Sequence, residues 1–226
     1  MVTGQATPEG TARYARRLAG RTTPEHFRPL ATELQASSIG LGTYLGREDD
    51  ATDALYRAAV TRALERGVNV LDTAVNYRHQ RSERAIGQAI STAIARGLVA
   101  RDEVIVASKG GFIPFDTAMP RDPAAYFTDT YLRTGIIRPD DVVGNVHCMT
   151  PRYLDDQIER SRKNLDLDTL DVYYVHNPET QLAEIERPVF LARLRDAFGA
   201  LEAAARDGRI GCYGTATWDG CPGSTR

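Results

Sequence analysis

Short apolar runs alternate with segments of helical periodicity along most of the chain. Five apolar runs are typical of strands, at residues 36–43, 68–71, 104–107, 171–175 and 209–215. Between them, apolar residues recur every three or four positions and predict helices at 51–66, 82–97, 150–164 and 188–208. Strands that alternate with helices pair in parallel through right-handed crossovers. The pattern therefore predicts an α/β fold with five parallel strands in sequence order.

Residues with special backbone preferences support these helix boundaries. Ser82 and Thr150 are favoured at helix N-caps, and Pro151 suits the first helical position. Gly67 and Gly208 suit the position that follows a helix. The helix at 51–66 is expected to turn one face inward, formed by Leu55, Ala58, Ala59, Arg62 and Ala63.

Two segments interrupt the alternation. Residues 1–33 contain prolines and mixed charges, and we expect a loosely packed N-terminal extension with a short helix near 11–19. Residues 110–143 are rich in proline and polar side chains, so we expect an insertion that lies over the strand ends. The remaining expectations are a hairpin near 30–38, a barrel-like domain at 34–218 and a tail at 219–226.

The composition is that of a globular protein without special partners. The 226 residues carry a formal net charge of −2, which gives no nucleic-acid footprint. No apolar run approaches the length of a membrane span, and the first residues lack the apolar core of a secretory signal. The three cysteines, Cys148, Cys212 and Cys221, match neither a disulfide framework nor a zinc pattern. We therefore expect reduced cysteines and a cytoplasmic location.

Four polar residues follow the predicted strands. Asp72 ends one apolar run with Tyr77 five residues later, Lys109 ends the next, and His176 ends the run at 171–175. Each alone has an ordinary structural explanation, such as a turn aspartate or a surface lysine. The carboxyl ends of parallel barrel strands meet at one edge, where α/β barrels place their chemistry. The four side chains are therefore expected to converge there.

These residues lie in segments that resemble the aldo-keto reductase family. Residues 67–87 (GVNVLDTAVNYRHQRSERAIG) resemble its first signature, and 104–111, 170–178 and 199–218 resemble its lysine, histidine and fifth strands. The resemblance implies a (β/α)8 TIM barrel. A complete barrel needs about 250 residues, and this chain spends many on its extension and insertion. We therefore expect an incomplete barrel of about five βα units, shortened at its C-terminal side.

The resemblance also implies roles for the four residues. Tyr77 would be the general acid for a carbonyl oxygen, Lys109 would lower the pKa of Tyr77, and Asp72 would hold Lys109. His176 would orient the carbonyl. An ammonium beside a phenol favours the phenolate, which agrees with this assignment.

The implied cofactor is NADP, with NAD as an alternative. The residues expected to bind it are Gly42, Thr43, Tyr44, Asp72 and Thr217. The pair Ala216-Thr217 departs from the Ser-Asn pair that the family uses to bind the nicotinamide amide, so at least one hydrogen bond is expected to be lost.

Three functions remain open from the sequence. The first is an oxidoreductase that moves hydride between NAD(P)H and an aldehyde or ketone, impaired in a shortened chain. The second is an inactive homologue that serves binding or assembly, or is a remnant. The third is a metal-dependent hydrolase that uses His147, His176 and Asp72. An open barrel would expose edges near Ile39 and Tyr213, so self-association is expected. Its interior is expected to be lined by Ile39, Val70, Ile105 and Tyr173.

Overall fold

A curved parallel sheet forms the centre of the molecule. The computed structural model describes residues 1–30 and 32–218, and its main sheet has the strand order β3-β4-β5-β6-β7. All neighbours in this sheet pair in parallel. The strands are β3 Leu41–Gly42, β4 Val70–Asp72, β5 Ile105–Gly110, β6 Leu170–His176 and β7 Ile210–Ala216. The prediction of an α/β fold with five parallel strands in order is confirmed, and the open sheet is consistent with an incomplete barrel.

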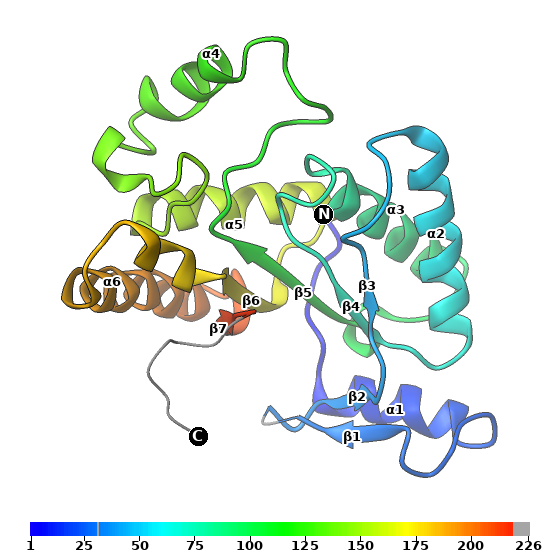
Figure 1. Cartoon of the computed structure of the whole chain (residues 1–226). Helices are drawn as coiled ribbons and strands as arrows, with labels where there is room; N and C mark the ends of the chain where they lie inside the picture. The colour runs from blue at the N-terminus through cyan, green and yellow to red at the C-terminus, as the bar shows by residue number, and fades with distance from the viewer. Residues whose placement is uncertain (31, 219–226) are drawn as a thin grey trace.

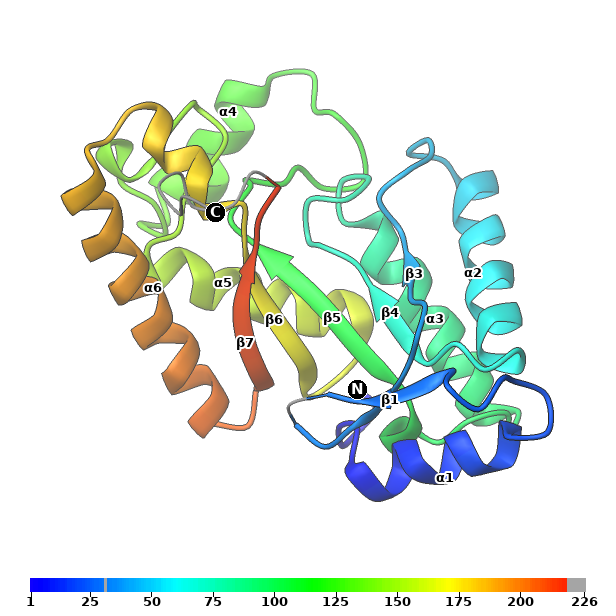
Figure 2. The same ribbon diagram turned by 60° about the horizontal axis from the view of Figure 1, so that its bottom comes forward.

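Helices cover the outer face of this sheet. They are α2 Asp50–Glu65, α3 Arg81–Ala95, α5 Pro151–Leu165 and α6 Arg187–Arg206. Figure 2 shows them as an arc around the outside of the strands. Their apolar side chains join those of the strands in one large core that includes Leu71, Ile90, Leu154, Tyr173 and Leu201.

The side chains alternate between the two faces of the sheet, and this corrects the predicted lining. Tyr173 packs in the outer core against the helices, whereas Val172 and Ile105 share an inner cluster. Ile39 does not line the interior, because its side chain is 61% exposed. A strand that is apolar on both faces does not reveal which residues point inward. Of the predicted lining, Val70 and Ile105 belong to the inner cluster.

The predicted first strand is divided between two sheets. Residues 35–37 form β2 (Gln35–Ser37), which pairs antiparallel with β1 (Phe27–Pro29) in a separate hairpin. Only Leu41 and Gly42 remain in the parallel sheet as β3. The hairpin is fixed by reciprocal bonds between Ser37 and Asn69: Ser37 N donates to Asn69 Oδ1 at 2.8 Å, and Asn69 N donates to Ser37 Oγ at 3.1 Å.

The N-terminal segment packs tightly, so the expectation of a loose extension was wrong. Helix α1 (Pro8–Leu18) buries Tyr14 completely, and the Tyr14 hydroxyl donates to the Leu64 carbonyl at 2.5 Å. The α1 helix and the β1–β2 hairpin lie at the end of the sheet opposite the insertion (Figure 1). Ala6, Leu34 and Ala36 join the inner cluster and cover that end of the sheet.

Two helix details also differ from the predictions. The buried residues of α2 are Val60 and Leu64, while Leu55 is 70% exposed and Ala58, Ala59 and Arg62 are exposed as well. Small alanines gain less from burial than the larger Val60 and Leu64. Ser82 lies inside α3 rather than at its N-cap, which is Gln80. The Ser82 hydroxyl donates to the Thr43 carbonyl at 2.7 Å and so ties α3 to the end of β3.

The insertion between β5 and α5 has its own structure beyond the strand ends (Figure 1). It contains α4 (Pro123–Phe127), a π-helical turn and a 3₁₀ turn, and its small core holds Tyr131, Ile137, Cys148 and Tyr153. Cys148 and Cys212 are free thiols, while Cys221 and the tail at 219–226 lie outside the described residues. In residues 1–30 and 32–218, no helix is long and apolar enough to cross a membrane. The cytoplasmic location stays a prediction.

Candidate active site

The four strand-end residues come together at the carboxyl edge of the sheet. Lys109, on β5, donates from Nζ to Asp72 Oδ1 at 2.6 Å and to Tyr77 Oη at 3.3 Å. The same ammonium donates to the Thr73 carbonyl at 2.8 Å. Asp72 ends β4, and Tyr77 lies in the loop that leads to α3. Lys109 is thus placed between a carboxylate and a phenol, and all three of its donors are used.

A second carboxylate lies behind Lys109 on the outer face of β5. Glu83 is completely buried, and it accepts hydrogen bonds from Ser108 Oγ at 2.6 Å and Asn164 Nδ2 at 2.8 Å. Burial raises the pKa of Glu83. Burial also lowers the pKa of Lys109, while the charges of Asp72 and Glu83 oppose that change. The ammonium is therefore bonded to Asp72 on one side of the strand and is influenced by the charge of Glu83 on the other.

The structure does not give the lowered tyrosine pKa that the sequence led us to expect. Burial raises the pKa of Tyr77 to about 12, with the charge of Asp72 and the neighbouring Tyr44 adding to the increase. The physical reason is that Asp72 lies close enough to Lys109 to compensate its charge. Tyr77 therefore faces a nearly neutral ion pair from a partly buried position, and it is fully protonated at neutral pH.

His176 completes the cluster as a neutral ring. Its ring centroid lies 5.7 Å from that of Tyr77 and 5.1 Å from that of Phe112. Burial, together with the charges of Lys109 and His147, lowers the pKa of His176 to about 3. Such a ring donates one hydrogen bond and accepts another at neutral pH, but it carries no positive charge. Phe112 was not predicted from the sequence, where its only signal is its position three residues after Lys109.

The residues predicted to bind a cofactor lie around this cluster. Thr43 is buried, and its hydroxyl donates to the Asp72 carbonyl at 3.2 Å. The exposed Tyr44 packs its ring 5.1 Å from that of Tyr77. A methyl group added at Gly42 would meet no atom within 4 Å, so the backbone there borders open space. Thr217 is exposed and directly follows β7.

The structure does not support His147 as a metal ligand. His147 Nε2 lies 2.7 Å from the His176 carbonyl oxygen, and His147 Nδ1 lies 3.0 Å from Gln181 Nε2. Both ring nitrogens of His147 are thus used in hydrogen bonds, which leaves no lone pair for a metal ion.

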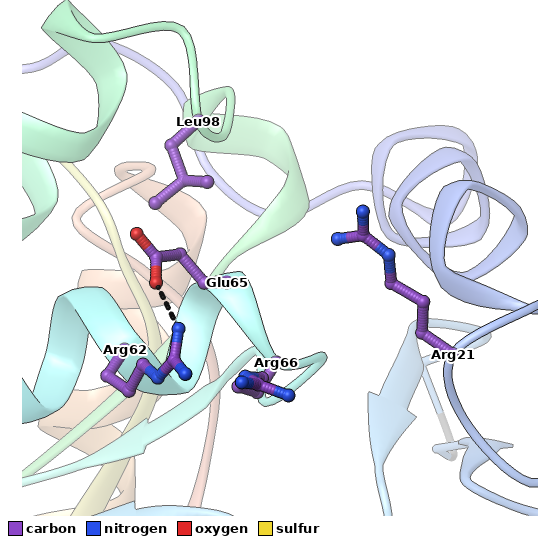
Figure 3. A pocket seen from close by; sticks show the side chains of 5 residues that line it. All are labelled: Arg21, Arg62, Glu65, Arg66 and Leu98. Atoms are coloured by element: carbon purple, nitrogen blue, oxygen red, sulfur yellow. Dashed lines mark hydrogen bonds and ion pairs between the residues drawn. The ribbon is translucent and has the colours of Figure 1, made fainter.

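The hollow shown in Figure 3 has a different character. It has a volume of about 500 Å³ and is lined by Arg21, Arg62, Glu65, Arg66 and Leu98, with Arg62 paired to Glu65 at 3.0 Å. Arg62 lies in the last turn of α2, and Arg66 follows that helix. Cations are favoured at helix C-termini, so these arginines have a structural explanation. None of the four clustered residues lines this hollow.

Comparison with known proteins identifies the family. The model of the Aldo/keto reductase family matches residues 38–221. The chain belongs to this family. The matched region contains the four clustered residues, Asp72, Tyr77, Lys109 and His176.

Curated relatives are distant and longer. Aldo-keto reductase AKR2E4 of Bombyx mori is 30% identical over 141 residues, which are 62% of this chain and 33% of the relative. Aldo-keto reductase YhdN of Bacillus subtilis is 28% identical over 172 residues, which are 74% of this chain and 42% of the relative. The chain therefore spans well under half the length of these two aldo-keto reductases.

Solved aldo-keto reductases share the fold. The enzyme of Bacillus halodurans superposes with a TM-score of 0.57 at 22% identity, over 84% of this chain and 50% of that one. An aldo/keto reductase of Klebsiella pneumoniae, solved in complex with NADP and acetate, gives 0.54 at 23% identity, over 87% and 51%. At these identities the likeness supports the barrel fold, of which this chain matches about half.

Proposed function

We propose that this chain carries the catalytic centre of an NADPH-dependent aldo-keto reductase that interconverts a small aldehyde or ketone and its alcohol. The observation that carries the proposal is the position of Lys109, 2.6 Å from Asp72 and 3.3 Å from Tyr77. Family membership supports it, and so do relatives solved with NADP, such as the enzymes of Klebsiella pneumoniae and Bombyx mori.

The strand ends fit a polar cofactor. Asn76 Oδ1 and Asn177 Oδ1 are buried there without a hydrogen-bond partner among the described residues. Buried polar atoms of this kind are costly unless a ligand satisfies them. We assign the binding of NADP, with NAD as an alternative, to Gly42, Thr43, Tyr44, Asp72 and Thr217. When bound, the nicotinamide would supply or accept the hydride.

Tyr77 is the proposed proton donor to the carbonyl oxygen. Its pKa of about 12 keeps it protonated at neutral pH. The Lys109 ammonium beside its hydroxyl would stabilise the phenolate that remains after proton transfer. Asp72 would keep that ammonium charged within a buried site.

His176 is proposed to orient the carbonyl through a hydrogen bond. With a pKa of about 3 it is neutral at physiological pH, so it is unsuited to replace Tyr77 as the acid. A positioned acid of this kind contributes on the order of 10²- to 10⁴-fold in rate.

The second candidate is a non-catalytic binding or assembly role. It is favoured by the sheet topology, because β3 and β7 are the outer strands of the described parallel sheet. Unpaired strand edges promote association with another chain, so self-association belongs to this proposal. Light scattering of the purified chain over a range of concentrations would measure it.

A titration of NADPH fluorescence, followed by assays with a panel of aldehydes and ketones, tests the first candidate. We expect weak NADPH binding and slow carbonyl reduction in the unmodified chain, because it matches only about half of the solved relatives. Tyr77→Phe should bind NADPH with similar affinity and reduce carbonyls at least about 10²-fold more slowly. NADPH binding without reduction of any carbonyl would contradict the enzymatic proposal and favour the binding role.

A further inference from the structure

His147 is held by hydrogen bonds at both ring nitrogens. It is completely buried near the end of the insertion, and it lies outside the proposed catalytic set. Gln181 Nε2 lies 3.0 Å from His147 Nδ1. An amide NH₂ group can only donate, so Nδ1 must accept and the ring proton must sit on Nε2. That N–H donates to the His176 carbonyl at 2.7 Å.

The chain of hydrogen bonds continues away from the site. Arg193 Nη1 on α6 donates to Gln181 Oε1 at 2.8 Å, which fixes the orientation of the Gln181 amide. The same guanidinium donates from Nη2 to the Asp140 carbonyl of the insertion at 2.9 Å. Arg193 on α6 therefore fixes, through Gln181, which ring nitrogen of His147 carries the proton. That nitrogen donates to the carbonyl at the end of β6.

His176 depends on its surroundings for its orientation. Its Nδ1 is buried and has no hydrogen-bond partner among the described residues. Its ring is instead contacted edge-on by Phe112 at 5.1 Å, and Phe112 also contacts the His147 ring edge-on at 5.2 Å. The ring of His176 is thus placed by its backbone and by the rings of Phe112 and Tyr77, and His147 contacts the first two of these three.

The close approach of these groups requires a glycine. Gly111 has a φ of +152°, and a Cβ there would lie 2.7 Å from His147 Nε2 and 2.8 Å from the His176 oxygen. Any larger residue would separate the donor from the acceptor. A glycine at position 111 therefore allows the hydrogen bond between His147 and the His176 carbonyl.

We propose that His147 is a positioning residue for His176, which it holds through the main-chain carbonyl at the end of β6. The catalytic consequence rests on the proposed reductase function. A displacement of about 1 Å at a reacting group can cost about 10²-fold in rate. The insertion then contributes to catalysis without touching the substrate.

The test compares His147→Phe with His147→Gln. The phenyl ring fills the space without a donor, whereas the glutamine amide offers an N–H at a similar distance. NMR of the histidine rings is practical because the chain has four histidines. We expect His147→Phe to displace the His176 ring signals and to lower kcat about 10²-fold, with KM for NADPH unchanged. His147→Gln should keep the His176 signals near their original positions and restore kcat to within about tenfold of the unmodified chain.

A control separates positioning from general stability. Leu64→Ala removes buried side-chain volume near the C-terminal end of α2, a helix that contributes no residue to the hydrogen bonds of His147. It should lower Tm while leaving the His176 signals and kcat unchanged. If it displaces the His176 signals as much as His147→Phe does, or if His147→Phe leaves both the signals and kcat unchanged, the proposal is overturned.

Two further outcomes are covered. If His147→Phe does not fold, Gln181→Leu removes the donor to Nδ1 and should still shift the His176 signals; unshifted signals would overturn the proposal. If the unmodified chain reduces no carbonyl, the proposed function fails. The NMR comparison still decides the positioning role in that case.

Discussion

The two ends of the parallel sheet each contain an ion pair, and the two pairs differ in how deeply they are buried. At the amino end, Asp171 accepts from Arg101 Nη2 at 2.9 Å, from Val106 N at 2.7 Å and from Ala6 N at 2.6 Å. Both side chains of this pair are almost fully buried. At the carboxyl end, Lys109 is buried, but the side chain of Asp72 remains 39% exposed.

The polar groups around the two ion pairs also differ in how completely they are hydrogen-bonded. The Arg101 guanidinium also donates from its two terminal nitrogens to the Val104 and Thr169 carbonyls, and only its Nε lacks a partner among the described residues. At the carboxyl end, the buried side-chain oxygens of Asn76 and Asn177 have no hydrogen-bond partner among the described residues. Unsatisfied and strained groups collect at functional sites, where other parts of the fold supply the stability. The amino-end pair is therefore the more deeply buried of the two, and the carboxyl end is the more exposed one, where the proposed cofactor site lies.

The largest effect should come from breaking the amino-end pair. Arg101→Met leaves the Asp171 carboxylate buried without its cation. Removing one partner of a buried ion pair costs about 3 to 5 kcal/mol, and urea unfolding would measure the loss. Asp155, which pairs with Arg209 at the surface, supplies a control, because Asp155→Asn should cost less than about 1 kcal/mol. Equal losses from Arg101→Met and Asp155→Asn would refute the contrast between buried and surface pairs.

The matching change at the carboxyl end should affect activity more than stability. Lys109→Met leaves Asp72 facing solvent, so the free energy of unfolding should change by only about 1 kcal/mol. Carbonyl reduction should fall at least about 10²-fold, equivalent to about 2.7 kcal/mol of transition-state stabilisation. Steady-state assays and urea unfolding on the same preparation would measure both. A stability loss as large as that of Arg101→Met would show that the two ends do not differ.

The sequence predicted the carboxyl end better than the amino end. Asp72, Lys109 and His176 are recognisable because each interrupts or ends an apolar run, and Tyr77 follows at a motif spacing. The amino end depends on bonds between distant residues, such as Ala6 with Asp171, which leave no periodic signal.

The sequence also did not show which residues of each strand face the helices and which face the opposite side of the sheet. Tyr173 and Val172 both belong to an apolar run, and only the packed helices decide that Tyr173 faces outward. His147 illustrates the same limit, because its role depends on Gln181 and Arg193, which follow it by 34 and 46 positions. Motif spacing predicts groups that share a strand end but not the side chains that hold them in place.

Acid should weaken the carboxyl end through His176. Its pKa of about 3 in the folded protein lies below the ordinary value of 6.5, so below pH 6.5 the unfolded chain takes up a proton that the folded chain does not. Stability should therefore fall by about 1.4 kcal/mol per pH unit, or about 2 kcal/mol between pH 6.5 and 5. His176→Phe should lose less stability over this interval. An identical acid dependence in both proteins, measured by urea unfolding, would contradict the assignment of a low pKa to His176.

The smallest effect should come from the carboxylate behind Lys109. Glu83→Gln keeps the size of the side chain and one of the two oxygens that accept from Ser108 and Asn164, but it removes the charge that raises the pKa of Lys109. The pKa of Lys109, already lowered by burial, should fall further, and the alkaline limb of carbonyl reduction should move to lower pH with it. NMR titration of the lysine side chains can follow this directly, because Lys109 and Lys163 are the only lysines in the sequence. Glu65→Gln, in the hollow at the C-terminus of α2, is the matched control and should leave Lys109 unchanged. If Glu83→Gln also leaves the titration of Lys109 unchanged, Glu83 is neutral in the folded protein, and the ammonium is held from the inner face by Asp72 alone.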